Sequence, residues 1–290
     1  VFATPEIRQM YLRRVRTLAD ELLQPISTPL AARRYETRID QWAALVAPDA
    51  ALDLAKWGTW GNGSASSACC VQSLPTAVEL IKSGYLDPRR RYLLQTASVS
   101  NGGEIPLAQS SGASPEFGSL VINPSSGNQA EEFVELINPL SEAIDLSDWK
   151  LTGAIEHRFP GGTVIPAGRS LYLTPDARAF RARKTGPRGG QALLVQGNYH
   201  GQLSARGETL ELWNRSGQRA RTLTFPGNPS PSQKALRITE IMYHPANPPS
   251  GNTPADDFEY IELRNTGTTS LDLAGIHFTN GIRFSFSGSS

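Results

Sequence analysis

An internal repeat constrains this chain most: residues 132–163 and residues 259–290 align without a gap, 127 positions apart. Of the 32 aligned positions, 10 are identical. Apolar residues also coincide, as Val134 does with Ile261 and Leu136 with Leu263. Their spacing is mostly two, which is typical of strands with one buried face. The repeat predicts tandem β modules, the second of them cut short, and favours binding or scaffolding over catalysis.

Composition excludes some partners and gives little about compartment. The chain has 28 Lys and Arg against 27 Asp and Glu, so its net charge of +1 provides no general attraction to nucleic acid or anionic lipid. No apolar run approaches the roughly 20 residues of a membrane span, and no signal peptide is visible. The start at Val1 and the end within the repeat predict a fragment or a processed piece.

The two cysteines, Cys69 and Cys70, are neighbours in the chain. Their Cα atoms are therefore about 3.8 Å apart, which is closer than an unstrained disulfide prefers. No further Cys or nearby His completes a metal-ligand set. We expect two free thiols in a loop rich in Ser and Ala.

Residues 1–97 have a helical pattern. Thr4, Pro5 and Glu6 form a helix start, with a capping hydroxyl, a proline in the first turn and an early acid. One predicted face contains Ile7, Tyr11, Val15, Leu18 and Leu22. A second helix is expected from about Leu30, with the inward residues Tyr35, Ile39, Trp42 and Val46. A third is expected over residues 75–82, ending before Gly84.

The remainder of the chain predicts β structure between two linkers. Residues 98–116 are rich in Ser, Gly and Pro, and residues 227–235 are rich in Pro, which is linker composition in both cases. Short alternating runs predict strands at 120–122, 133–136, 170–173, 192–195, 209–213, 220–225 and 237–243. The fold class is thus multidomain: a helical N-terminal segment, a β-sandwich over 117–226, and a partial second sandwich over 236–290.

Several motifs of the β region resemble one family. They are the residues 122–124, 132–138, Asp145 with Leu146, Trp149, Phe159 with Pro160, 165–168 and 201–212, followed in the second copy by 239–245 and 259–265. This combination resembles the bacterial lamin-tail domain. The resemblance implies an immunoglobulin-like β-sandwich that serves as an interaction module.

The helical segment resembles the C-terminal end of a CotH-type kinase-like domain, on residues 10–23, 38–40 and 87–94. Such domains often precede lamin-tail domains in secreted bacterial proteins. The resemblance implies an extracellular or cell-envelope location. It also implies that nucleotide- and metal-binding residues would lie upstream of Val1, so none is assigned to this chain.

Catalytic motifs are incomplete. The loop at residues 58–64 has glycines but no lysine in a phosphate-binding pattern and no preceding strand, so it predicts a surface loop. The sequence has no Gly-x-Ser-x-Gly and no His-Glu-x-x-His. We therefore assign no catalytic and no cofactor-binding residues.

Two clusters are candidate binding sites. Asp256, Asp257 and Glu259 group at a loop-to-strand junction, where carboxylates suit Ca²⁺, although a solvated strand face explains them equally well. The densest basic run suits an acidic polymer, although a solvated loop is its plainer reading; it contains Arg178, Arg181, Arg183 and Lys184.

The functional hypothesis is a non-catalytic binding or scaffolding segment of a secreted or cell-surface bacterial protein. Its expected partner is a protein or an extracellular polymer, with neither nucleic acid nor a membrane span. The alternative is the C-terminal part of a CotH-type protein kinase whose catalytic core lies upstream.

Overall fold

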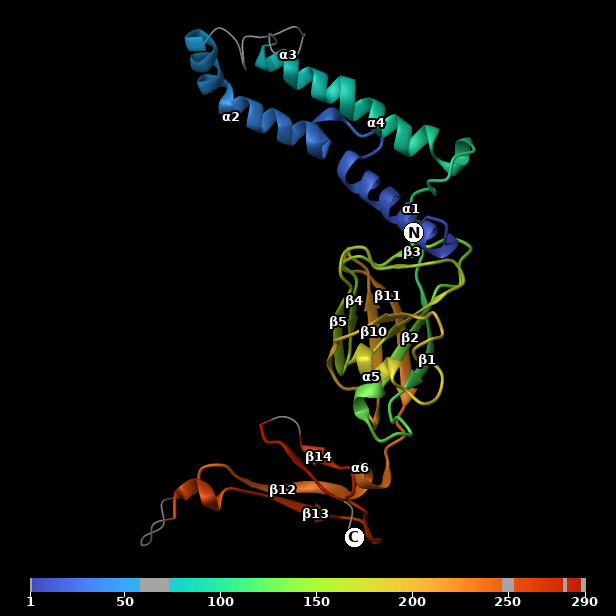
Figure 1. Ribbon diagram of the computed structural model, residues 1–290, viewed down its shortest axis with the longest axis vertical. Coiled ribbons are helices and arrows are strands. Elements are labelled where there is room, and N and C mark those ends of the chain that lie inside the picture. The colour runs from blue at the N-terminus through green and yellow to red at the C-terminus, as the bar shows by residue number, and fades with distance from the viewer. Residues whose placement is uncertain (1, 58–72, 247–252, 279–280, 288–290) are drawn as a thin grey trace. The chain divides into compact units, whose positions relative to one another are not determined.

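The computed structural model describes residues 2–57, 73–246, 253–278 and 281–287 (Figure 1). The chain divides into two compact units. The first unit contains Val1–Glu116, Ile137–Asp148 and Phe159–Ser170, and the second contains Phe117–Leu136, Trp149–Arg158 and Leu171–Ser290. Two short stretches of the β region, Ile137–Asp148 and Phe159–Ser170, thus cluster with the helices.

The first unit begins with helices. In chain order they are α1 (Pro5–Leu18), η1 (Ala19–Leu23), η2 (Leu30–Ala32), α2 (Arg34–Trp57), α3 (Leu74–Glu79), η3 (Leu80–Leu86), α4 (Asp87–Arg91), η4 (Tyr92–Thr96) and η5 (Val99–Asn101). Helix α1 begins after Thr4 with Pro5 in its first turn, as predicted, but the predicted capping bond is wrong, because the Thr4 hydroxyl caps no backbone N–H. Pro at this position costs little because its missing N–H would have no partner within the helix.

The predicted helix stop before Gly84 is wrong. The segments α3, η3, α4 and η4 follow one another without interruption from Leu74 to Thr96, and Figure 1 draws them as one rod beside α2. A glycine inside a helix costs about 1 kcal/mol relative to alanine. Burial of Leu86 and Arg90, at 7% and 0% exposure, offsets that cost in the turns that follow.

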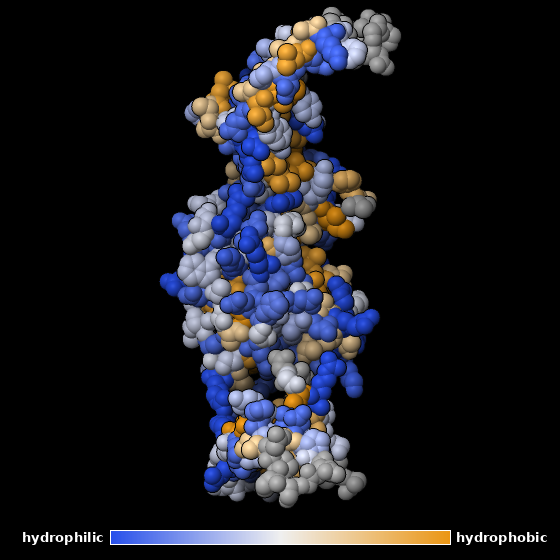
Figure 2. All heavy atoms as spheres, turned by 90° about the vertical axis from the view of Figure 1, so that its left-hand side faces the viewer, coloured by the Kyte–Doolittle hydropathy of each residue, from blue (hydrophilic) through white to orange (hydrophobic). Residues whose placement is uncertain are grey.

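The predicted apolar faces of the first two helices are wrong in part: Val15, Leu18 and Leu22 are half-buried, but other members are exposed. Tyr11 and Trp42 remain 51% and 56% exposed, whereas the buried residues of α1 are Arg13 and Arg16 and that of α2 is Glu36. Figure 2 shows hydrophobic residues at the surface of the helical segment. Charged side chains occupy the inward positions because each finds an oppositely charged or carbonyl partner there.

The first unit also contains a two-stranded ladder of β3 (Ile144–Asp145) and β6 (Val164–Ile165). Ile144 pairs with Ile165 in antiparallel register, and both are fully buried. Helix α1 packs against both strands.

The second unit contains two larger sheets. One is four-stranded in the order β1-β2-β7-β8, and the other is five-stranded in the order β11-β10-β4-β5-β9. Their bounds are β1 (Glu116–Val121), β2 (Phe133–Ile137), β4 (Lys150–Thr152), β5 (Ile155–Arg158), β7 (Ser170–Leu173), β8 (Leu194–Gln196), β9 (His200–Gly201), β10 (Gly207–Trp213) and β11 (Arg219–Pro226). A short helix, α5 (Ala177–Arg181), follows β7, and a single turn, η6 (Gln129–Glu131), precedes β2.

Burial alternates along these strands. In β10, Leu210 and Leu212 are fully buried, Glu211 between them is half-buried, and Thr209 before them is exposed. One aromatic cluster joins the sheet to α5: the rings of Phe133, Tyr172 and Phe180 lie 5.5 to 5.6 Å apart. The arrangement of helices followed by several β-sheets confirms the predicted fold class and is consistent with an immunoglobulin-like sandwich, although β7 and β8 pair in parallel.

The last segment contains α6 (Pro231–Ala235), β12 (Leu236–Met242), η7 (Ala255–Phe258), β13 (Tyr260–Asn265), β14 (His277–Phe278) and β15 (Phe284–Ser285). Its strands form two two-stranded sheets, β12-β13 and β14-β15. A capping box between Ser230 and Gln233 starts α6 inside the segment predicted as the second linker.

The sequence repeat has matching backbone geometry. In the β4-β5 hairpin Leu151 pairs with His157, and in the β14-β15 hairpin Phe278 pairs with Phe284, each residue being 127 positions later. The loops match as well: Asn138 Nδ2 donates to the Glu142 carbonyl at 2.8 Å, and Asn265 Nδ2 donates to the Thr269 carbonyl at the same distance.

Candidate functional site

An arginine on helix α1 forms the centre of the most extensive polar contact in the first unit. Arg13 is 1% exposed, and its Nε donates to the Ala143 carbonyl at 2.8 Å. Its Nη1 donates to the Leu107 carbonyl at 2.7 Å, and its Nη2 pairs with the Glu142 carboxylate at 2.6 Å. Burial lowers the pKa of Arg13, and the charge of Glu142 opposes that shift. The guanidinium is thus held by three separate partners.

The next residue extends this contact to strand β3. Arg14 Nη1 donates to Ser147 Oγ at 2.8 Å and to the Asp145 carboxylate at 3.2 Å. The side chain of Gln109 brackets the backbone of Asp145, accepting from its N–H at 2.8 Å and donating to its carbonyl at 3.2 Å. The side-chain amide of Gln109 thus makes the same two hydrogen bonds to Asp145 that the backbone of a neighbouring strand would make.

Arg16 completes a row along the same side of α1. Its Nη1 donates to the Pro106 carbonyl at 3.1 Å, and its Nε pairs with Asp20 at 2.8 Å. Ile105 next to this contact is 5% exposed. We refer to Arg13, Arg14 and Arg16 as the arginine clamp. It holds α1 to residues 105–109 and to the β3-β6 ladder.

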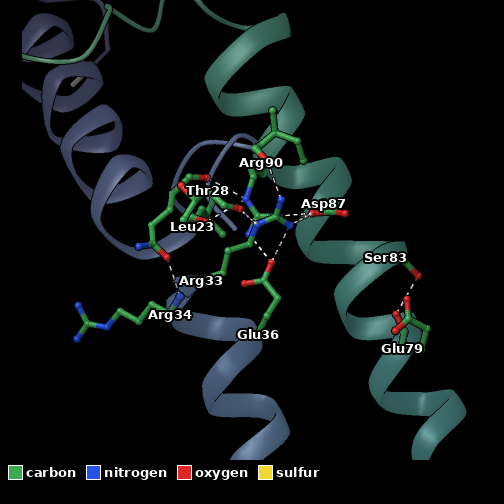
Figure 3. A network of polar contacts seen from close by, with 11 residues as sticks. Leu23, Thr28, Arg33, Arg34, Glu36, Glu79, Ser83, Asp87 and Arg90 are labelled. Carbon is green, nitrogen blue, oxygen red and sulfur yellow. Dashed lines mark hydrogen bonds and ion pairs between the residues drawn. The ribbon is translucent and has the colours of Figure 1, made fainter. Parts of the chain in front are cut away.

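A second buried polar network joins the start of α2 to α4. Figure 3 shows the side chains of this network converging. Arg33 and Arg90 face the carboxylates of Glu36 and Asp87, and the Arg33 Nη1 to Asp87 Oδ1 distance is 3.0 Å. Three of the four are almost fully buried, with Asp87 at the edge.

The remaining donors of both guanidinium groups bind backbone carbonyls. Arg33 donates to Thr28 and Ile26 at 2.9 and 2.8 Å, and Arg90 Nε donates to the carbonyl of Leu23 at 2.9 Å. The carbonyls of Ile26 and Thr28 lie between η1 and η2, and Leu23 is the last residue of η1. The network therefore fixes a helix-helix turn, and its carboxylates are occupied by arginines.

The second unit buries one carboxylate, Glu132, at 1% exposure. Its Oε1 accepts from Tyr199 Oη at 2.7 Å and from the Leu203 N–H at 3.1 Å, and its Oε2 accepts from Gln129. Burial raises the pKa of Glu132, and these three donors oppose the shift. Burial, together with the adjacent Glu132, also raises the pKa of Tyr199. Glu132 thereby links the start of β2 to the segment between β9 and β10.

The predicted calcium residues lie close together in the chain but do not converge. Asp256 and Asp257 belong to η7, Glu259 follows it, and all three are exposed. Within the part of the chain that the structure describes, no group of three or more His, Cys, Asp or Glu side chains could hold a metal ion. Calcium binding by these residues stays a prediction.

The predicted basic run is divided by the fold. Arg178 and Arg181 lie on α5 and are exposed, as is Lys184. Arg183 differs from the expectation for this run: it is 8% exposed, lies 5.0 Å from the Phe133 ring, and donates to the Glu131 carbonyl at 2.6 Å. Arg183 therefore has a structural role in the loop that follows α5. Of the four predicted residues, Arg178, Arg181 and Lys184 remain exposed.

Other predicted features lie outside the described residues, namely Cys69, Cys70 and the loop at 58–64. Among the described helices, none is long and apolar enough to cross a membrane.

Sequence reasoning missed the buried charges. The available signal was the three-residue spacing of Arg13 and Arg16, which places them on one helix face opposite the apolar stripe. Glu132 gave no such signal, because its partners Tyr199 and Leu203 are far away in the chain.

These sheets are consistent with an immunoglobulin-like β-sandwich that follows a helical segment. The sequence comparison agrees: residues 108–227 match the family model of the Lamin Tail Domain. The match begins inside the segment predicted as the first linker, where Gln109 contacts Asp145. No curated protein matches the chain significantly. A lamin-tail sandwich is in general a non-catalytic protein-interaction module, so the match favours binding over catalysis for this stretch.

Proposed function

We propose that this chain is a binding and scaffolding segment in which part of a lamin-tail module, the β3-β6 ladder, binds helix α1. The arginine clamp carries the proposal. It joins α1, outside the matched residues 108–227, to the β3-β6 ladder inside them, through bonds to Ala143, Glu142 and Asp145. Removing the partners of a buried arginine that makes several hydrogen bonds strongly destabilises the folded protein. A contact of this kind is expected in a rigid scaffold and is not needed in a flexible tether.

We further propose that residues 236–290 belong to a second lamin-tail copy. The matched registers of the β4-β5 and β14-β15 hairpins support this, as does the shared Asn138 and Asn265 turn. Two copies in tandem would offer two equivalent interaction surfaces on one chain.

The proposed setting is a secreted or cell-surface bacterial protein in which these modules follow a CotH-type domain. Its support is the resemblance of residues 10–23, 38–40 and 87–94 to the end of such a domain. The proposed partner is a protein or an extracellular polymer. The gene upstream of residue 1 tests this setting, because a signal peptide and a CotH-type core are both expected there.

Clamp removal tests the scaffolding role. In Arg13→Ala, we expect the amides of α1 to exchange with solvent at least tenfold faster while those of β10 and β11 keep their wild-type rates. Arg8→Ala is the matched control, because Arg8 lies on the same helix and its partner Glu104 is 60% exposed. Equal exchange in all three proteins would contradict a scaffold held by the clamp.

A catalytic assay tests the alternative, in which the parent is an atypical kinase. The chain is incubated with ATP, Mg²⁺ and a general protein substrate, and phosphate transfer is measured. We expect none from residues 1–290. Turnover that a point substitution within the chain abolishes would refute the non-catalytic role.

The exposed cations of the α5 region favour an acidic polymer as one class of partner. Arg178, Arg181 and Lys184 form no ion pair with a described residue. Binding to a polyanion such as heparin should weaken steeply with salt, and Arg181→Ala should reduce it. Affinity that ignores salt would remove this candidate.

A further inference from the structure

The five-stranded sheet of the second unit has an outer face, on the side away from the sandwich interior. Leu212 of β10 pairs with Leu151 of β4, and both are fully buried, so this pair points inward. Successive residues of a strand point to opposite faces, and residues that pair across a ladder share a face. The adjacent pair, Trp213 and Lys150, therefore lies on the outer face.

Two further strands extend this pair into a row of cations. Arg158 of β5 pairs with Lys150, and Arg219 of β11 pairs with Trp213. All three cations are exposed. The four strands lie side by side in the order β5, β4, β10 and β11 (Figure 1). Neighbouring strands are about 4.8 Å apart, so the row spans about 14 Å across the sheet. We refer to Arg158, Lys150, Trp213 and Arg219 as the cationic row.

The tryptophan in this row is held in one orientation. Its indole Nε1 donates to Thr152 Oγ1 at 3.1 Å, and the guanidinium carbon of Arg219 lies 6.0 Å from the ring centroid. Arg219 Nη1 also pairs with Glu211 at 2.7 Å, which places Arg219 on the same outer face. The indole is half-buried. Its exposed part is therefore a fixed apolar surface between cations.

Hydroxyl groups continue the outer face beside the cationic row. Thr209 of β10 pairs with Thr224 of β11, and their Oγ1 atoms lie 2.9 Å apart. Thr222, which pairs with Glu211, is exposed between these threonines and the row. A hydroxyl both donates and accepts hydrogen bonds, whereas a carboxylate only accepts. This part of the face therefore suits a ligand that has hydroxyl groups of its own.

We propose that the outer face of the five-stranded sheet binds an acidic polysaccharide. The carboxylates of the polymer pair with the cationic row, a sugar ring packs on Trp213, and sugar hydroxyls bind the neighbouring threonines. Charge complementarity supports this occupant, because the row itself contains three cations and no acid. The inference rests on the binding role proposed above and gives that role a surface separate from α5.

The acids on the same face favour a polysaccharide over a nucleic acid. Glu156 is exposed and pairs with His200 of β9, and Glu211 lies beside the row. Both carboxylates can accept hydrogen bonds from sugar hydroxyls. The phosphodiester backbone of DNA has no such donors, so these acids would only repel it.

An oligomer of galacturonate tests the proposal, because it has a carboxylate on each sugar and no sulfate. We expect the full chain to bind it in isothermal titration calorimetry, with affinity that falls as salt rises. Bound oligomer should slow hydrogen exchange within residues 150–152, 209–213 and 219–224. The methyl-esterified oligomer is the neutral control, and its binding should be much weaker.

Substitutions in the row separate charge from stacking. Replacing Lys150 and Arg158 together by Gln should weaken binding about tenfold and make it less sensitive to salt. Both side chains are exposed, so the fold should be unaffected. Trp213→Ala should weaken binding about tenfold with an unchanged salt dependence. Arg181→Gln is the matched control, because it removes an exposed cation of α5 and should change affinity by less than about twofold.

Several results would overturn the inference: no binding, equal binding of the neutral oligomer, or unchanged affinity after the double substitution. Tighter binding of single-stranded DNA than of the galacturonate oligomer would replace the polysaccharide by a nucleic acid. Loss of binding in Arg181→Gln alone would place the polymer on α5, which refutes this site and leaves the proposed binding role intact. The exchange of α1 amides in Arg13→Ala reports the scaffolding role independently of any polymer.

Discussion

Buried charges determine the stability of the helical turn at the scale of single residues. Glu36 is 2% exposed and lies between Arg33 and Arg90, which are 6% and 0% exposed. Such groups give little net stability as a pair, but removing one partner leaves the other uncompensated in a medium of low polarity. The stability of the turn therefore depends strongly on Glu36, since its removal would leave the buried charges of Arg33 and Arg90 without this partner.

Glu36→Ala should lower the free energy of unfolding of the helical segment by about 3 to 5 kcal/mol. Circular dichroism at 222 nm during urea unfolding measures the change. Asp40→Ala on the same helix is the control, since the Asp40 side chain is 59% exposed in its pair with Lys82 and should change stability by less than about 1 kcal/mol. Similar effects of the two substitutions would contradict the role of burial.

Glu132 introduces a pH dependence of the opposite sign to that of most carboxylates. Its pKa is raised in the folded state because burial disfavours the charged form. A raised pKa means that the folded state holds the proton more tightly than the unfolded state does. The corresponding stability is fully present below the unfolded pKa, about 4.3, and is lost as pH rises through the folded pKa.

Glu132→Gln tests this linkage. We expect the difference in unfolding free energy between wild type and variant to change in that pH window and to be constant well above it. Thermal unfolding monitored in the near ultraviolet at several pH values measures the difference. A difference that is flat from pH 4 upward would show that Glu132 has its ordinary pKa.

At the scale of elements, strands were more predictable than helix faces. Each of the seven predicted strands overlaps a strand of the structure, because apolar residues mark it between turn residues. Within residues 117–226, the strands β3, β4, β5, β6 and β9 were missed. The two-residue strands β3, β6 and β9 have too few positions for a period, and their pairing is set by partners elsewhere in the chain.

The helices show why a periodic pattern need not identify the buried face. The stripe through Tyr11 is as regular as the one through Arg13 and Arg16. Hydrophobicity predicts that the stripe through Tyr11 is the buried one. The structure instead buries the stripe through Arg13 and Arg16, because Glu142 and the carbonyl of Ala143 provide partners for the charge of Arg13. The clamp could not be read from the sequence, since these partners are more than a hundred residues away.

Gly201 is a backbone requirement of the β5-β9 pairing. Its φ is +90°, and a Cβ there would lie 2.1 Å from the Ala154 carbonyl oxygen. Gly201→Ala should therefore cost more than about 2 kcal/mol, the sum of an unfavourable φ and a clash with backbone. Gly127→Ala is the control, because φ is +75° there but no atom lies within 4 Å. Calorimetric unfolding of both variants measures the two costs, and equal values would contradict the clash.

At the scale of the whole molecule, buried apolar residues are unevenly distributed along the chain. Among the described residues, the buried hydrophobic ones end at Phe225. Beyond it, Ile238, Ile241 and Tyr243 are 52%, 57% and 78% exposed. A segment with few buried contacts opens at low free energy, so the residues from about 236 onward should open more readily than residues 117–226.

Limited proteolysis should therefore remove residues from about 236 onward before it cleaves within residues 117–226. Mass spectrometry of fragments from a short thermolysin time course identifies the order, because this protease cleaves before apolar residues such as the exposed Ile238 and Ile241. Simultaneous cleavage of both regions would mean that their stabilities are equal, despite the difference in burial between Leu136 and Leu263.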